Sequence, residues 1–203
     1  MIRQERLALA DRLGSVTDAQ WRQPSLCEGW TIHTVLAHLT VPFLVDRKEV
    51  VSTVVRERSI TRAFDRQAQR IAATKTPEEL VDVLRDNAAT SFRPPGMPYE
   101  APFTDILAHH ADISWALGDN HEYWDDPARL RPSLDFLVSP RARIGFVTAG
   151  RAKGITLVAT DLDWRHGGGA EVGGPGLSLI MALLGRAPAI DDLVGNGVPV
   201  LAR

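Results

Sequence analysis

The stretch FTDILAHHADISWALG, residues 103–118, sets ionisable side chains into an otherwise mostly apolar segment. Its apolar residues recur with the period of an α-helix, and Gly118 is the residue type that commonly follows a helix end. The pattern predicts a helix over about 103–117. At about 100° per residue, Asp105, His109 and Asp112 share one face, whereas His110 points to the apolar side. The two adjacent histidines should therefore differ in role, with His110 a packing residue.

Two interpretations are open for the polar face formed by Asp105, His109 and Asp112. In the first, it is a solvated surface that carries a weak ion pair at i,i+4 spacing, which is common and contributes little to stability. In the second, the three side chains form part of a binding site. A second histidine in the chain bears on the choice.

His38 lies in the segment TIHTVLAHLTVPFLV, where its helical neighbours are Val35, Pro42 and Val45. A buried imidazole without partners costs about 1–3 kcal/mol, so His38 must meet polar groups. It is either a core histidine bonded to a backbone carbonyl, or it faces Asp105 and His109 across a bundle of helices. In the latter case two imidazoles and a carboxylate, with a fourth position open, suit reactive Zn²⁺ and can also bind Ni²⁺ or Fe²⁺.

The rest of the chain reads as a series of helices followed by a strand-containing tail. Before residue 140 the period and the cap residues predict helices over about 2–13, 31–58 with an interruption at Pro42, 60–73, 77–91, 103–117 and 127–138. Beyond it, GITLVATD is strand-like, the glycines of RHGGGAEVGG predict a hairpin turn, and PGLSLIMALLGR predicts a helix. We therefore expect a mainly α fold, with an antiparallel four-helix bundle over 1–140 and a small α+β domain over 141–203.

Composition excludes several classes of partner. The formal net charge is −2 and no long Lys/Arg cluster occurs, so we expect no nucleic-acid partner. No apolar run is long enough to span a bilayer, and the single cysteine, Cys27, cannot form an internal disulfide. We expect a cytoplasmic monomer or homodimer without membrane contact, in which Cys27 is a small buried thiol.

Three segments together resemble the mycothiol-dependent maleylpyruvate isomerase family: WRQPSLCEGWTIHTVLAHL (21–39), DILAHHADISWALG (105–118) and TDLDWRHGGGAEVGGPGLSLIMALLGR (160–186). The resemblance implies a DinB-like four-helix bundle that binds a divalent metal, usually zinc. It implies His38, Asp105 and His109 as the metal ligands, with Asp112 behind them, orienting a ligand or a bound group.

The resemblance also implies a reaction. Mycothiol is expected to bind the metal as a thiolate, because a coordinated thiol loses its proton at neutral pH. In the isomerase the thiolate adds to an electron-poor double bond, the new single bond rotates, and elimination returns the trans isomer. Other members transfer the thiol to different electrophiles. Arg186 matches an arginine thought to assist the site, although a cation near a helix end also has a plain role at the helix dipole.

The resemblance is incomplete in three places. The family's isomerases carry glutamate where this chain has Asp105, many relatives have an aspartate in the segment of Thr34, and the tail after residue 140 is short. We therefore expect a metal-dependent, mycothiol-using isomerase or thiol S-transferase acting on a small electrophile, including carboxylate-bearing ones. The alternatives are a metal-dependent hydrolase that activates water, and a non-catalytic metal-binding or stress-associated module.

Overall fold

The computed structural model describes residues 1–94, 96–119, 126–147 and 150–202. The chain forms two compact units, one of residues 1–94 with 105–119 and the other of residues 95–104 with 120–203. The change from one unit to the other at Thr104/Asp105 falls inside a helix, α7 (Glu100–Ala116). The expected division into a domain over 1–140 and a domain over 141–203 stays a prediction.

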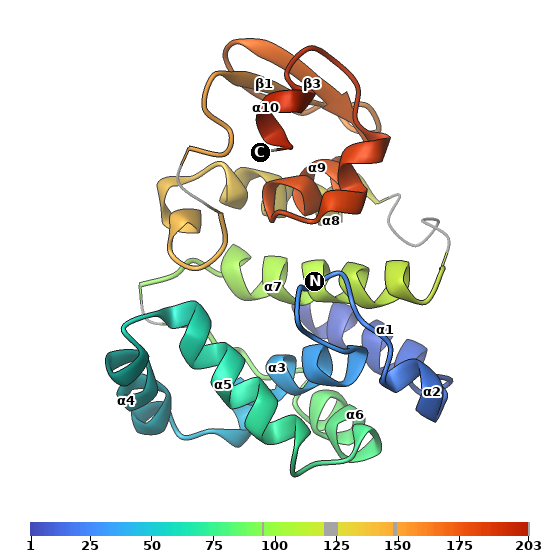
Figure 1. The fold of residues 1–203 in the computed structure, drawn as a ribbon, viewed down its shortest axis with the longest axis vertical. Helices are drawn as coiled ribbons and strands as arrows, with labels where there is room; N and C mark the ends of the chain where they lie inside the picture. Colours follow the sequence, from blue (N-terminus) through green and yellow to red (C-terminus); the bar gives the residue numbers. More distant parts are fainter. Residues whose placement is uncertain (95, 120–125, 148–149, 203) are drawn as a thin grey trace. The chain divides into compact units, whose positions relative to one another are not determined.

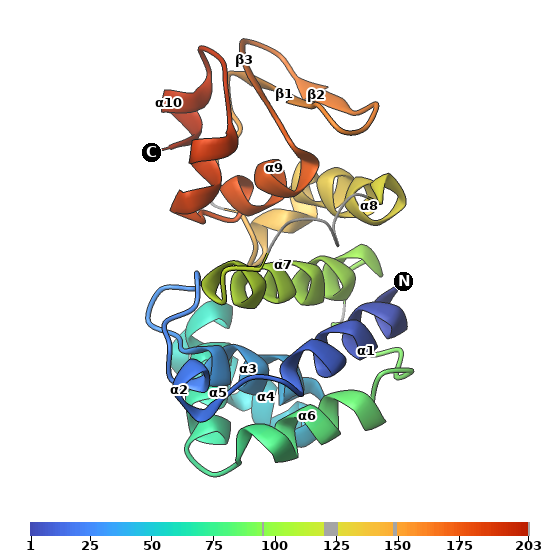
Figure 2. The same cartoon turned by 90° about the vertical axis from the view of Figure 1, so that its right-hand side faces the viewer.

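The first unit is entirely helical in its described regular structure (Figure 1). Besides the second half of α7, its helices are α1 (Ile2–Leu13), α2 (Asp18–Trp21), α3 (Ile32–Leu44), α4 (Arg47–Glu57), α5 (Ile60–Ala72) and α6 (Pro77–Asp86). The central helix α3 packs against α5 and α6, while α1 packs against α6 (Figure 2). The core of this bundle therefore forms around α3, where Val35, Leu36 and Ala37 are fully buried.

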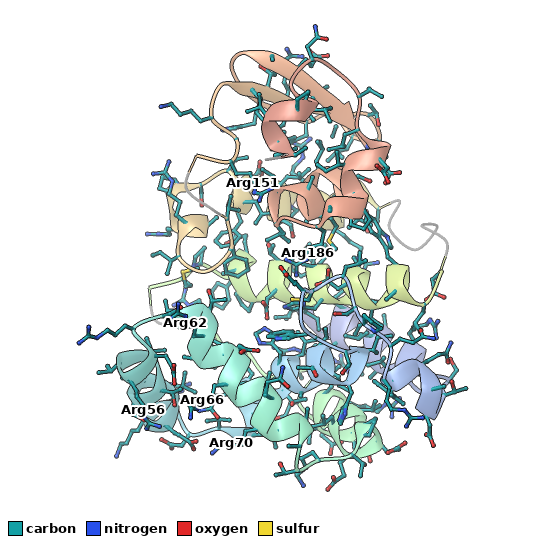
Figure 3. The ribbon with its side chains drawn as sticks, in the orientation of Figure 1. Arg56, Arg62, Arg66, Arg70, Arg151 and Arg186 are labelled. Atoms are coloured by element: carbon teal, nitrogen blue, oxygen red, sulfur yellow. The ribbon has the colours of Figure 1, made fainter. Side chains whose placement is uncertain are left out.

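Helix α4 is attached mainly through α5. Arg66 on α5 pairs with Glu57 at 2.5 Å, and Arg70 pairs with Glu49 at 2.6 Å, so that the arginines of one helix face the acids of the other (Figure 3). Behind these exposed pairs, Gln67 donates a buried hydrogen bond of 3.0 Å to Thr53.

The single helix predicted over 31–58 is wrong, because the chain breaks between α3 and α4. Val45 has extended dihedrals, and Asp46 then caps α4 by accepting a 2.7 Å hydrogen bond from the Lys48 backbone N–H. Pro42 lies inside α3 just before its C-terminal end, so the hydrogen bond that its nitrogen cannot donate to the His38 carbonyl affects only the last turn. The capping preference of aspartate therefore marks the break.

The second unit contains the first residues of α7, α8 (Pro127–Leu137), a three-stranded sheet and the helix that covers it. The strands are β1 (Ile155–Ala159), β2 (Arg165–Gly167) and β3 (Ala170–Gly174), followed by α9 (Gly176–Leu183) and α10 (Val198–Leu201), with short 3-10 helices η2 (Pro140–Arg143) and η3 (Ala187–Asp192). Helix α9 packs on β1 and β3 and contacts α8 on its other side (Figure 2).

The glycines of residues 167–169 do not form the predicted hairpin turn. The strand order is β2-β1-β3, with β2 antiparallel and β3 parallel to the same central strand. The segment between them passes close to the start of β1: a Cβ on Gly169 would lie 2.1 Å from the Gly154 carbonyl oxygen, and one on Gly167 would lie 2.3 Å from that of Ile155. Both glycines also have positive φ, +130° and +99°, so the crossing needs residues without a side chain.

The predicted fold class, mainly α with a small α+β part at the C-terminal end, is confirmed. Among the described residues, no helix has the length and apolar character required to cross a membrane.

Candidate metal centre

Two helices of the first unit supply the candidate ligands. His38 lies on α3, whose start is fixed by Thr31: its side chain accepts a 3.2 Å hydrogen bond from the Thr34 backbone N–H. Asp105 and His109 lie one turn apart on α7. Thr34, where many relatives were expected to have an aspartate, is buried and its hydroxyl lies 3.0 Å from that of Thr31.

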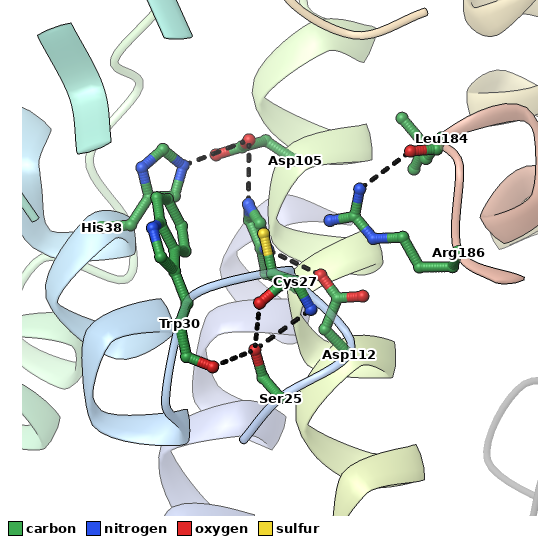
Figure 4. A network of polar contacts seen from close by, with 9 residues as sticks. Ser25, Cys27, Trp30, His38, Asp105, Asp112, Leu184 and Arg186 are labelled. Atoms are coloured by element: carbon green, nitrogen blue, oxygen red, sulfur yellow. Dashed lines mark hydrogen bonds and ion pairs between the residues drawn. The ribbon is translucent and has the colours of Figure 1, made fainter. Parts of the chain in front are cut away.

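The structure brings His38, Asp105 and His109 together. Asp105 Oδ1 lies 3.5 Å from His38 Nε2 and 3.7 Å from His109 Nε2 (Figure 4), and the three ligand atoms all lie within 4.8 Å of one another. Donors bound tetrahedrally to zinc at about 2.1 Å are separated by about 3.4 Å. The separations from the carboxylate are long for hydrogen bonds and close to those around an ion.

Asp112 fixes the orientation of His109. Its Oδ2 atom lies 2.9 Å from His109 Nδ1, and its side chain is 0% exposed. A carboxylate accepts from the Nδ1 proton, so the ring keeps its lone pair on Nε2, the nitrogen that faces Asp105. The structure therefore contains the carboxylate–histidine pair that commonly supports a metal ligand.

His38 is held differently, by aromatic rings. Its ring centroid lies 5.0 Å from that of Trp30 and 5.6 Å from that of Phe64. Trp30 also stacks on His109 at 5.9 Å, and its indole N–H donates a 2.7 Å hydrogen bond to Asp65. Of the described residues, none accepts a hydrogen bond from the buried His38 Nδ1. Sequence reasoning assigned Trp30 no role, although it lies in one of the segments that carry the resemblance.

The burial of the group excludes the solvated surface considered from the sequence. The side chains of His38 and His109 are 11% and 9% exposed, whereas Asp105 is 36% exposed. Two nitrogen donors thus lie in a largely dehydrated environment, and the carboxylate between them stays accessible. The residues present fit a divalent cation in donor type, spacing and orientation.

Comparison with known proteins places the chain in a family. Residues 2–124 match the model of the mycothiol maleylpyruvate isomerase N-terminal domain. The chain belongs to this family. Among solved structures it is similar to the mycothiol-dependent maleylpyruvate isomerase, with 17% identity and a TM-score of 0.59, covering 97% of this chain and 93% of that chain. A histidine-to-alanine mutant of such an isomerase gives 16% identity, a TM-score of 0.58 and the same coverage. No curated protein matches the chain.

In this member of the mycothiol maleylpyruvate isomerase family, Arg186 belongs to the second unit. It follows Gly185, whose φ of +88° ends α9, and its backbone N–H donates a 2.9 Å hydrogen bond to the Met181 carbonyl, as in a Schellman motif. Its guanidinium donates to the Leu184 carbonyl at 2.9 Å (Figure 4). The turn therefore fixes the backbone of Arg186, and its part in the family's chemistry stays a prediction.

His110 is buried, as expected of a packing residue, but it also has a polar partner that was not foreseen. Its Nδ1 atom lies 2.6 Å from Oε1 of Glu5 on α1, and both side chains are nearly inaccessible. Burial lowers the pKa of His110 to about 4, so the ring is neutral at pH 7. His110 thus ties α7 to α1 while its neighbour His109 faces α3.

Cys27 is not the buried thiol expected from the sequence, because it is partly exposed. It lies in the loop between α2 and α3, where Ser25 donates hydrogen bonds to the carbonyls of Cys27 and Trp30 at 3.3 and 2.9 Å. Its Sγ atom and ligand atoms of His109 and Asp112 all lie within 4.8 Å of one another. The Cys27 thiol therefore lies beside His109, which is also one of the three candidate metal ligands.

Proposed function

We propose that this chain is a metal-dependent enzyme that uses mycothiol as its thiol, with His38, Asp105 and His109 as ligands of a divalent cation, preferably zinc. The observation that carries the proposal is the pair His109–Asp112, which directs the His109 Nε2 lone pair toward Asp105 and His38. Family membership supports the choice of thiol. A divalent metal at such a site supplies Lewis acidity, under which a coordinated thiol loses its proton at neutral pH.

The surrounding residues have distinct parts in this proposal. Asp112 holds the proton on His109 Nδ1 and so keeps the ring in the binding tautomer. Trp30 packs against both imidazoles and excludes water from that side of them. Arg186 is assigned to an anionic group of the substrate or thiol, since a guanidinium binds carboxylates through two parallel hydrogen bonds.

The reaction we propose is the addition of the thiolate sulfur to an electron-poor double bond of a small substrate. The electron pair of the double bond moves toward the electron-withdrawing group, rotation follows about the resulting single bond, and elimination restores the thiolate and the trans alkene. Where the electrophile carries a leaving group, that group departs with its electron pair in place of the thiolate, and a stable thioether remains. The activity is therefore an isomerisation or an S-transfer.

Metal content tests the first part of the proposal. Purified Cys27→Ser protein, in which the neighbouring thiol cannot hold zinc, should bind one equivalent after reconstitution, and His38→Ala in the same background should lose it. His33→Ala is the matched control, because His33 lies on the same helix and contacts Trp21 rather than the cluster. Equal zinc retention in Cys27→Ser with and without His38→Ala would contradict the ligand assignment.

Thiol use and reaction type are tested separately. Mycothiol at millimolar concentration should raise the melting temperature of the zinc-loaded protein, because a ligand that binds only the folded state stabilises it. Product analysis with a cis-configured, electron-poor alkene should then give the trans isomer or a thiol adduct. A hydrated product formed without mycothiol would instead show that the site activates water, as the hydrolase alternative requires.

A further inference from the structure

Cys27 belongs to a second group of potential metal ligands that overlaps the first. This group consists of Cys27 on the loop between α2 and α3 together with His109 and Asp112 on α7, and its ligand atoms all lie within 4.8 Å of one another. His38 and Asp105 are outside it. His109 is the one residue shared by the two groups.

We propose that Cys27, His109 and Asp112 form a second cation site, selective for thiophilic divalent ions such as Cd²⁺ or excess Zn²⁺. A thiolate, an imidazole and a carboxylate are all accepted by zinc, and a soft sulfur ligand favours thiophilic metals over Mg²⁺ or Ca²⁺. Around a tetrahedral ion, sulfur at about 2.3 Å and nitrogen at about 2.1 Å are separated by about 3.6 Å. Closing the group onto an ion therefore requires its ligand atoms to approach one another by about 1.2 Å at most.

The backbone around Cys27 is anchored, so this adjustment falls to the side chain. The Cys27 N–H donates to Ser25 Oγ at 3.1 Å, and the Trp30 N–H donates to the Cys27 carbonyl at 3.0 Å. The neighbouring Leu26 N–H donates to the Asp112 backbone carbonyl at 3.5 Å. The last contact attaches the loop to α7 at the residue that supplies the carboxylate. Cys27 is also partly exposed, which leaves a path for an ion from solvent.

The two sites compete because they share His109. A neutral imidazole has one lone-pair nitrogen, so His109 can serve one ion at a time whichever nitrogen it uses. Asp112 has a part in both arrangements although it belongs to one group only, since it orients His109 in the first and is itself a ligand in the second. An ion bound to Cys27 therefore withdraws His109 from the site that it forms with His38 and Asp105. The inhibition of activity that follows rests on the proposed function, whereas the site itself does not.

Cadmium titration of the metal-free protein tests the site directly. Cadmium bound to a thiolate gives an ultraviolet charge-transfer band, and Cys27 is the single cysteine of the chain, so any such band belongs to it. We expect the band to saturate at one equivalent in wild type and to be absent in Cys27→Ser. His38→Ala should bind cadmium at Cys27 as tightly as wild type or more tightly, because the competing site is gone.

Variants of the shared residue decide between this site and its alternatives. His109→Ala and the bulkier His109→Gln should each lower the cadmium affinity read from the thiolate band by at least about tenfold. Loss of a group that only supports a ligand already costs that much, and loss of a ligand should cost more. An unchanged affinity in both would mean that the thiol binds cadmium alone, and would overturn the proposal. Loss of the band in His38→Ala would also overturn it, because Cys27 would then be a ligand of the first centre.

The same variants separate this inference from the proposed function. If Cys27→Ser keeps one zinc and its response to mycothiol while losing the cadmium band, both proposals stand. If wild type shows the cadmium band with the expected variant pattern but no response to mycothiol, the thiol-dependent function fails and the second site stands.

In wild type, cadmium should also slow alkylation of Cys27 by iodoacetamide. Alkylation at an unchanged rate would count against the site without relying on any variant.

Discussion

Replacement of Asp112 by asparagine isolates the contribution of one buried charge to metal binding. Asp112 Oδ2 lies 2.9 Å from His109 Nδ1, and the two side chains are 0% and 9% exposed, so solvent cannot replace the contact. Asparagine has nearly the same shape and can still offer a carbonyl oxygen to Nδ1–H. The substitution therefore removes the charge while leaving the packing of α7 in place.

The expected loss of zinc affinity is about tenfold to a hundredfold. A hydrogen bond to a charged group contributes about 1.5–3 kcal/mol and a neutral one about 0.5–1.5, so the difference is about 1–2 kcal/mol. Each 1.4 kcal/mol corresponds to a factor of about ten, so this difference alone gives about five- to thirtyfold. Loss of a group behind a metal ligand costs a factor of about 10–100 overall, which sets the expected range. If the amide turns its NH₂ toward Nδ1, the ring proton moves to Nε2 and the loss lies at the upper end.

Competition with a fluorescent zinc chelator measures this affinity, and the melting temperature with and without zinc provides a second reading. Asp119→Asn is the matched control, because Asp119 pairs with Arg12 at 2.5 Å and lies outside the cluster. The control should bind zinc as wild type does. Zinc affinity equal to wild type in Asp112→Asn would refute the reasoning, since His109 would then need no oriented tautomer.

Three further predictions concern the ligand length, the buried histidine and the glycine crossing. Asp105→Glu should weaken zinc binding less than about tenfold, because the longer carboxylate can fold back toward the ion. Asp105→Ala should lower zinc affinity more than about a hundredfold, which exceeds the effect of losing a group behind a ligand. Equal losses of affinity for the two variants in chelator competition would contradict this. Because burial lowers the folded-state pKa of His110 to about 4 from its ordinary value of 6.5, the unfolded chain takes up the proton first. The unfolding free energy of the metal-free protein should therefore fall by up to about 3 kcal/mol between pH 6.5 and pH 4, and urea titrations should show a smaller fall in His110→Gln; identical pH dependence would exclude His110 as the source. Gly169→Ala should destabilise the fold by about 1–3 kcal/mol, because its Cβ would meet the Gly154 carbonyl oxygen at 2.1 Å and its φ is +130°. Gly168→Ala is the control: its Cβ would meet open space, so its unfolding free energy in the same urea assay should be nearly that of wild type.

The helices were predictable where their end signals are local. Helix α1 has the expected bounds, with Gly14 after its last residue, and α6 begins with the expected capping box of Thr76 and Glu79. The end of α3 was missed because the pattern of apolar residues continues past it. There the N-cap preference of Asp46 outweighed helical periodicity.

Strand pairing was less predictable, because it depends on contacts far apart in the sequence. The run of glycines 167–169 is compatible with a hairpin between β2 and β3, and local turn chemistry favours that interpretation. In the structure β1 lies between these strands, so the glycines serve the crossing past Gly154 and Ile155. Nothing in the local pattern distinguishes a turn from a close backbone approach.

The candidate site was predictable in its polar members and not in its supports. His38 was singled out because its helical neighbours are apolar, and the structure places it next to Asp105 and His109. The helical pattern could not predict the contacts of Trp30 or Glu5 with the histidines, because those contacts depend on how a loop and a distant helix pack. Whether the three residues hold a metal stays a prediction that the zinc measurements test.

The burial of polar groups along α7 separates side chains that already have partners from those that we predict to bind a cation. His110 is satisfied by Glu5, and His109 Nδ1 is satisfied by Asp112, so the helix meets the cost of burying these groups with good hydrogen bonds. The distances from Asp105 to His38 Nε2 and His109 Nε2, 3.5 and 3.7 Å, are instead long for hydrogen bonds and close to those between ligands of one ion. A divalent ion between these atoms would take up both Nε2 lone pairs, and we predict that the site holds one. Metal binding should therefore contribute to folding stability as well as to chemistry.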